Sequence, residues 1–161
     1  MYKFMKQIIL LSATLLSLNL HAQERVQANF NHKALLSSDD PLLAANKQLV
    51  YNFWREVFEA GHMELAPKYM SENYIQHNPN VATGRKAFID FFSALKKPQP
   101  IADRINAPLV NIVAEGDIVI LSFVREKPDP TKKGATYTTT WFDMFRIEDG
   151  KITEHWDPMM K

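Results

Sequence analysis

The sequence contains no cysteine and few glycines, and its charges nearly cancel. Without cysteine the fold cannot use disulfides, and the chain cannot be a lipoprotein that carries its lipid on a cysteine. The formal net charge is +1 over 161 residues, with no basic run, so nucleic acid is not an expected partner. Neither a Gly-x-Ser-x-Gly elbow nor a glycine-rich phosphate loop occurs, which argues against a serine hydrolase of that type and a phosphate-cradling nucleotide site.

Long hydrophobic runs are also absent. The longest, Ile8–Leu18, is shorter than the roughly 20 residues that a membrane-spanning helix needs. Lys3 and Lys6 precede this run, and Ala22 offers a small residue at a cleavage point. These features predict a cleavable secretory signal over residues 1–22. We therefore expect export to the periplasm or the outside of the cell, with no membrane contact after cleavage.

The first half of the remaining chain predicts helices. Residues 23–40 show no sustained period and are expected to form a flexible tether, with one folded domain over 41–161. The pair Asp40-Pro41 is typical of a helix start, and apolar residues then recur at helical spacing until Gly61. Two further helices are predicted, one around residues 64–70 and one that begins near Gly84.

The second half predicts strands. Residues 105–114, 118–126, 136–148 and 151–157 are rich in β-branched and aromatic residues, and a short extended segment, Tyr74–Pro79, precedes them. Asp149-Gly150 is a strong signal for a tight hairpin turn. Helices followed by an antiparallel sheet define the α+β class.

Strand periodicity places the residues around this turn on two faces. With Asp149 and Gly150 at the centre of the turn, Ile147 pairs with Ile152 and Asp143 lies opposite Trp156. One mostly apolar wall then comprises Trp141, Asp143, Phe145, Ile147, Ile152 and Trp156. The opposite face carries Arg146, Thr153, His155 and Asp157. A β-bulge would shift this assignment by one residue.

Asp143 stands out because a carboxylate is out of character in the middle of an apolar strand. Desolvation on an apolar wall would raise its pKa and make it a better base near neutral pH. The alternative is a structural carboxylate paired with Arg104, Arg125 or Arg146, because perturbed carboxylates also occur in ion-pair networks.

Three segments carry a resemblance to a known family: YIQHNP (Tyr74–Pro79), FDMFRIEDGKI (Phe142–Ile152) and EHWD (Glu154–Asp157). Together with the helical half, they resemble the SnoaL-like polyketide cyclases of the nuclear transport factor 2-like superfamily, over roughly residues 42–158. The resemblance implies a curved antiparallel sheet wrapped into a cone (an α+β barrel) and closed by the N-terminal helices, with a pocket inside. It also implies that Asp143 matches the catalytic aspartate of the family.

The chemistry that the resemblance implies is abstraction of a proton next to a carbonyl, of the cyclase or isomerase type. It needs no cofactor: neither a metal, a flavin nor a nucleotide. The expected ligand is a small apolar carbonyl compound. Because one such fold hosts many activities, the alternative is a non-catalytic module that holds an apolar ligand or a partner. A homodimer is expected through the outer face of the sheet around Ser122–Arg125.

Each of the remaining candidate site residues could have a functional or a purely structural role. In family terms His77 borders the pocket and polarises the substrate carbonyl, but it could equally cap a turn. Tyr74 could donate its hydroxyl to an oxyanion or simply pack in the core. His155 and Asp157 would reach the pocket only through a bulge, and with His77 they make a weak two-histidine, one-carboxylate metal pattern; we expect no metal. Phe53 and Trp54 are core residues that could line the cavity mouth.

Overall fold

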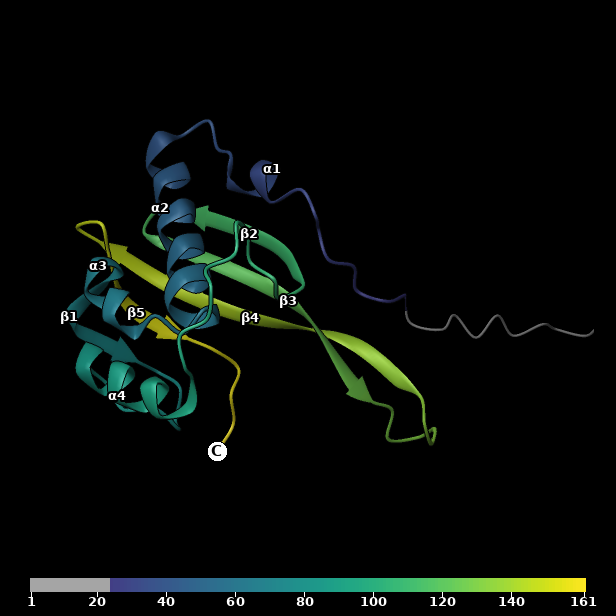
Figure 1. The fold of residues 1–161 in the computed structure, drawn as a ribbon. Coiled ribbons are helices and arrows are strands. Elements are labelled where there is room, and N and C mark those ends of the chain that lie inside the picture. Colours follow the sequence, from purple (N-terminus) through teal and green to yellow (C-terminus); the bar gives the residue numbers. More distant parts are fainter. Residues whose placement is uncertain (1–23) are drawn as a thin grey trace, which may run out of the picture.

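The computed structural model describes residues 24–161, and the predicted signal segment lies outside the described residues. Helices and strands are largely segregated along the chain (Figure 1), as expected for the α+β class: apart from the strand Met70–Gln76, all strands follow the helices. The helical elements are α1 (His32–Leu36), α2 (Pro41–Asn52), a π-helical segment η1 (Phe53–Glu59), a single 3-10 turn η2 (Met63–Leu65), α3 (Ala66–Tyr69) and α4 (Arg85–Leu95). The strands are β1 (Met70–Gln76), β2 (Leu109–Glu115), β3 (Ile118–Pro128), β4 (Thr136–Glu148) and β5 (Lys151–Trp156).

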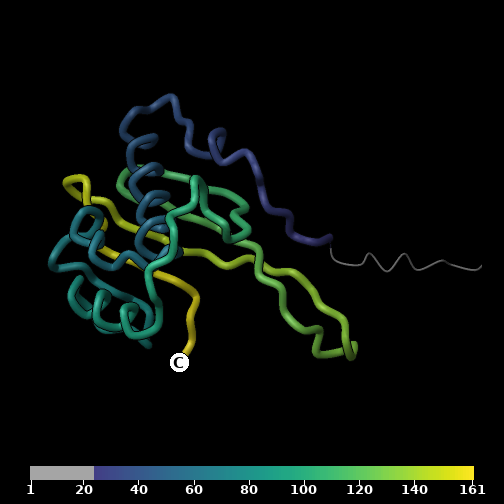
Figure 2. The backbone as a smooth tube through the Cα atoms, in the orientation of Figure 1, coloured from purple at the N-terminus to yellow at the C-terminus, as the bar shows by residue number. Residues whose placement is uncertain are grey.

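The five strands form one curved sheet in the order β1-β5-β4-β3-β2. Neighbours from β2 to β5 are antiparallel, whereas β1 lies parallel to β5. The parallel pair departs from the expected all-antiparallel sheet; it is possible because residues 77–150 separate β1 from β5 and can make the crossover. The long β3–β4 hairpin extends away from the helices (Figure 2).

Local sequence signals explain the element boundaries. Asp40 caps α2 through its Oδ1, which accepts hydrogen bonds from the backbone N–H groups of Leu42 and Leu43 at 2.7 and 3.4 Å, as an N-cap aspartate does. Asp149 and Gly150 have φ angles of 50° and 69°, the left-handed values that a two-residue hairpin of type I′ requires. Both predicted boundaries are confirmed.

Gly61 terminates the helical run for two reasons. Its φ of 79° lies in the left-handed region, which glycine enters without strain. In addition, a Cβ atom at this position would meet the carbonyl oxygen of Lys97 at 2.9 Å. The helical run therefore ends in a turn here.

The core lies between the concave face of the sheet and the helices. Inward-facing residues of β3, such as Val119 and Leu121, are fully buried and pack in the same cluster as Val50 and Val57 of α2 and η1. Burial of such side chains contributes roughly 1.5–3 kcal/mol each. A cluster of this extent stabilises a domain without disulfides.

Residues 24–39 contact the domain, which the interpretation as a flexible tether did not anticipate. The backbone N–H of Val26 donates to Thr138 Oγ1 at 2.8 Å, and that of Asn29 donates to the carbonyl of Leu109, also at 2.8 Å. His32 Nδ1 lies 2.7 Å from the Tyr51 hydroxyl. The partners in these contacts lie 19 to 112 residues away in the chain. Local sequence periodicity cannot predict contacts between such distant residues.

Candidate active site

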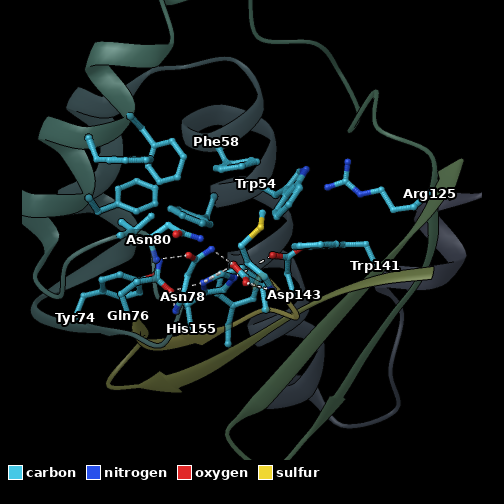
Figure 3. Close-up of a pocket in the computed structure, with 18 residues that line it drawn as sticks. Trp54, Phe58, Tyr74, Gln76, Asn78, Asn80, Arg125, Trp141, Asp143 and His155 are labelled. Atoms are coloured by element: carbon cyan, nitrogen blue, oxygen red, sulfur yellow. Dashed lines mark hydrogen bonds and ion pairs between the residues drawn. The ribbon is translucent and has the colours of Figure 1, made fainter. Parts of the chain in front are cut away.

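A cavity of about 220 Å³ lies between the concave face of the sheet, η1 and α4 (Figure 3). Its walls are mainly aromatic and come from all three elements: Phe53, Trp54, Phe58, Phe88, Trp141 and Phe145. Polar side chains converge at one end of it: Tyr74, Gln76, Asn78, Asp143, His155 and Asp157. A small apolar pocket with a few convergent polar groups is the usual form of a ligand site.

The π-helical segment η1 supplies part of the aromatic wall. Phe53 and Trp54 both line the cavity, as the sequence suggested they could. Trp54 stacks on Phe123 with a centroid distance of 4.5 Å and an interplanar angle of 25°, and Phe53 packs edge-on against Phe145 at 5.9 Å. These contacts hold the wall in place through packing rather than hydrogen bonding.

Asp143 is the buried carboxylate of the cavity, with an exposed fraction of 4%. Its Oδ1 lies 3.0 Å from His155 Nε2, whereas its Oδ2 has no hydrogen-bond partner among the described residues. Burial raises the pKa of the Asp143 carboxyl above its ordinary value, although the neighbouring His155 opposes this shift. The result is a desolvated carboxylate with one uncommitted oxygen.

Among residues 24–161, no arginine forms an ion pair with Asp143, which was the structural alternative; its partner is His155. Arg146 pairs instead with Asp117 and Glu154 on the other face of the sheet. The guanidinium of Arg125 lies over the Trp141 ring at 4.8 Å, and that of Arg104 lies over Phe30.

A β-bulge brings His155 and Asp157 into the cavity. The expected pair Ile147–Ile152 is confirmed, but the register then shifts, so that Phe145 lies opposite His155. The predicted pairing of Asp143 with Trp156 is therefore wrong, because an extra residue in β5 exchanges its two faces beyond the bulge. His155 packs against the Phe145 ring at 4.7 Å.

Trp156 is consequently on the outer face, and the prediction that it forms part of the apolar wall is corrected. It pairs with Met144 and does not line the cavity. The other two aromatic members of the predicted wall, Trp141 and Phe145, do line it.

Both ring nitrogens of His155 have partners. Nδ1 lies 2.9 Å from Gln76 Oε1, an acceptor that also receives the backbone N–H of Asn78. This assigns the Nδ1 proton to the bond with Gln76 and directs Nε2 towards Asp143.

The end of β1 contributes a row of polar groups to the same network. Gln76 Nε2 donates to the Tyr74 hydroxyl at 3.0 Å, and Asn78 Nδ2 donates to Asp157 Oδ2 at 2.7 Å. Tyr74 is 1% exposed, and burial, with Asp157 and Asp143 nearby, raises its pKa. Tyr74 therefore stays protonated, and its O–H is available as a neutral donor to a ligand.

His77 lies outside the cavity, contrary to the position that the resemblance implied. Its Nε2 is 3.0 Å from Glu154 Oε2, and its ring stacks on Trp156 at 4.7 Å with an interplanar angle of 5°. The physical reason is strand alternation: Tyr74 and Gln76 point inward, so His77 points outward. Gln76 and Asn78, which the sequence reasoning missed, could have been found from the same alternation.

The metal pattern of His77, His155 and Asp157 is not assembled, since His77 is on the other face. A different trio, Asp143, His155 and Asp157, has ligand atoms within 4.8 Å of one another. Both nitrogens of His155 already face hydrogen-bond partners, so a metal ion would have to displace one of them. The arrangement suits proton transfer better than coordination.

Comparison with known proteins agrees with this fold. A candidate SnoaL-like polyketide cyclase from Jannaschia sp. CCS1 is 18% identical with a TM-score of 0.51, over 76% of this chain and 91% of that one. A candidate polyketide cyclase from Acidithiobacillus ferrooxidans is also 18% identical with a TM-score of 0.51, over 75% and 89%. An LEH-like epoxide hydrolase from M. tuberculosis is 12% identical with a TM-score of 0.51, over 74% and 81%. Among curated proteins, none matches the chain.

The fold and the site define a ligand-binding α+β cone with an acid–base cluster at one end. The model of the SnoaL-like domain matches residues 50–155, which is most of the chain. The chain therefore belongs to the SnoaL-like family within the nuclear transport factor 2-like superfamily. None of the helices within residues 24–161 is long and apolar enough to cross a membrane.

Proposed function

We propose that this protein is an exported SnoaL-like enzyme that binds a small apolar carbonyl compound and removes a proton next to the carbonyl group. The observation that carries the proposal is Asp143: a desolvated carboxylate, hydrogen-bonded to His155 through one oxygen and uncommitted at the other, at the polar end of an aromatic cavity. Burial raises its pKa, which strengthens it as a base.

The proposed step uses the free oxygen of Asp143. Asp143 Oδ2 takes the α-proton, the electron pair of the C–H bond forms the new C=C bond, and the carbonyl oxygen becomes an enolate oxygen. Where the substrate has a neighbouring C=C bond, the enolate is a dienolate and the Asp143 proton returns to its γ-carbon while the carbonyl re-forms, as in an isomerase. In an aldol cyclisation the enolate carbon instead adds to a second carbonyl, and the resulting alkoxide oxygen takes the proton from Asp143. Both outcomes balance without a redox partner.

Tyr74 supplies the donor for the enolate in this proposal. Its hydroxyl lines the cavity and already accepts a hydrogen bond from Gln76, so its own proton is free to point at the ligand. Donors that are positioned before the charge develops stabilise it at little reorganisation cost. Tyr74 thus takes the role that the sequence had suggested for His77 as well.

The decisive experiment follows exchange of α-protons into deuterated water by NMR, with β-benzoylpropionamide as a neutral probe ketone. Asp143→Asn should lower the enzyme-dependent exchange rate by about a hundredfold or more, since a positioned general base contributes roughly 10²–10⁴-fold, while binding of the probe survives. Glu154→Gln is the matched control, because Glu154 also contacts a histidine at 3.0 Å but lies on the outer face.

Two results would contradict the proposal. Unchanged exchange in Asp143→Asn would remove its main residue. Probe binding without any exchange above background in the wild-type protein would favour the alternative, a non-catalytic binding module.

Export is the second part of the proposal, and it rests on the sequence of residues 1–22. Intact-mass measurement of protein secreted by a Gram-negative host should give a mature chain that begins at Gln23. A soluble product that retains residues 1–22 would contradict export.

We also propose a homodimer through the outer face of the sheet. Val113 and Phe142 are 47% and 51% exposed on β2 and β4, while Ser122 between them is almost fully buried. A stable pair would have to bury an interface of standard size, about 1,600 Å². Light scattering at high micromolar concentration should give twice the monomer mass; a monomer mass would exclude the dimer.

A further inference from the structure

Charge is distributed unevenly around the cavity. Two carboxylates, those of Asp143 and Asp157, lie at its polar end, and both side chains are less than a tenth exposed. Of the described residues that line the cavity, Arg125 is the one with a permanently positive side chain. Figure 3 shows Arg125 on the other side of Trp54 from Tyr74 and Asn80, so the aromatic wall separates the arginine from the polar end.

The positive charge of Arg125 is uncompensated within residues 24–161. Its guanidinium lies over the Trp141 ring at 4.8 Å, and its partner across the ladder, Thr139, is neutral. The adjacent carboxylate, Glu126, pairs with Arg25 instead. Arginine keeps its charge at every working pH and presents a planar fork that fits a carboxylate.

A second cation lies on the same side of the aromatic wall. Arg125, Trp54 and Phe58 also line a neighbouring cavity of about 200 Å³, to which Lys96 contributes. Lys96 Nζ lies 3.8 Å from the centroid of the Phe58 ring. The carboxylate at this cavity, Glu59, is already engaged by the backbone N–H groups of residues 106–107 at 2.8 and 2.7 Å.

We infer that the natural substrate is an apolar ketone that carries a carboxylate, and that Arg125 binds this carboxylate at the mouth of the cavity. The inference rests on the proposed function, because it takes Asp143 as the base for the carbonyl end. Like charges repel, so Asp143 and Asp157 exclude the anionic group from the polar end. Repulsion at one end and attraction at the other place the ketone next to Asp143.

The test compares two isosteric probes, β-benzoylpropionate and β-benzoylpropionamide, which differ in one charge. Binding is followed by quenching of the tryptophan fluorescence, since Trp54 and Trp141 line the cavity. The wild-type protein should bind the carboxylate about fivefold more tightly than the amide, the fold-change expected for a partly exposed ion pair. Added salt should weaken binding of the carboxylate alone.

Variants assign the preference to a residue. Arg125→Gln should bind both probes equally, and Arg125→Lys should recover part of the preference because it restores the charge without the fork. Arg104→Gln is the matched control: Arg104 is also exposed and also lies over an aromatic ring, that of Phe30, but it does not line the cavity. It should keep the full preference.

The outcomes separate the two proposals. No preference for the carboxylate in the wild-type protein, or the same preference in Arg125→Gln, overturns the role of Arg125. Exchange of the amide probe that depends on Asp143 would still support the proposed function in that case. Conversely, a preference that depends on Arg125 without any α-proton exchange supports an anion-binding cavity and contradicts the enzyme.

Discussion

Two histidine–carboxylate pairs lie on opposite faces of the sheet formed by β1, β5 and β4, and they have the same distance but different surroundings. His155 Nε2 is 3.0 Å from Asp143 inside the cavity, and His77 Nε2 is 3.0 Å from Glu154 on the outer face. The inner side chains are 10% and 6% exposed, whereas the outer ones are 40% and 22% exposed.

The two carboxylates respond to these surroundings in opposite directions. Burial raises the pKa of Asp143, while the hydrogen bond from His77, followed by Arg146, lowers the pKa of Glu154. A histidine–carboxylate pair is therefore a desolvated acid–base group on one face and a partly exposed hydrogen-bonded pair on the other. The comparison shows that environment, rather than residue type, distinguishes the candidate base from a structural carboxylate.

After loss of Asp143, removal of the Tyr74 hydroxyl at the cavity should give the largest fall in the rate of α-proton exchange. Tyr74→Phe removes the proposed enolate donor and should slow α-proton exchange by about a hundredfold, the lower range for loss of one oxyanion donor. Probe binding should change little, because the ring remains. Tyr137→Phe is the control, because Tyr137 is a partly exposed tyrosine of the β3–β4 hairpin. It should leave α-proton exchange at the wild-type rate. Equal exchange rates in the two variants would exclude Tyr74 as the donor.

The next largest difference in exchange rate should separate alanine variants of the two histidines, His155 and His77. His155→Ala leaves Asp143 without its hydrogen-bond partner and should slow exchange by about tenfold, below the full effect of losing a catalytic acid or base. His77→Ala loses only contacts on the outer face and should change the rate by less than about twofold. A larger effect of His77→Ala than of His155→Ala would reverse the assignment of the two faces.

The inner carboxylate should destabilise the protein at neutral pH. A raised folded-state pKa means that the folded state holds its proton more tightly than the unfolded chain, so the ionised form costs stability once the pH exceeds that pKa. Asp143→Asn should therefore increase the free energy of unfolding at pH 7. The gain should shrink as the pH falls from the raised value towards the ordinary value of 3.8. Urea unfolding measures it, and a destabilised Asp143→Asn protein would indicate a structural carboxylate.

The outer carboxylate should show the opposite and smallest effect. Because the folded-state pKa of Glu154 is lowered, its ionised form contributes stability above the ordinary value of 4.5, and this contribution is lost as the pH falls through the lowered pKa. Glu154→Gln should slightly reduce stability at pH 7, as expected for a partly exposed pair, and the difference should vanish in acid. A pH-independent loss would mean that packing, rather than charge, explains the role of Glu154.

Much of the architecture follows from local sequence signals. The start of α2 at Asp40-Pro41, the bounds of β4 and the turn at Asp149-Gly150 depend on interactions between residues a few positions apart, so one sequence suffices to predict them. The same holds for Asp143 on an inward-facing position of β4, because alternation along a strand is local. Alternation along β1 would also have separated Tyr74 from His77.

The composition of the site depends on contacts between distant segments. The bulge in β5 exchanges Trp156 for His155 at the cavity, and its position depends on how β5 fits between β4 and β1 rather than on its own residues. Likewise, the Gln76 amide reaches His155 across 79 residues of sequence, and residues 24–39 find partners on β2 and β4. The sequence alone identifies the strands and the candidate base, whereas the packing of strands selects which histidine faces that base, because a shift of one residue moves every following side chain to the other face.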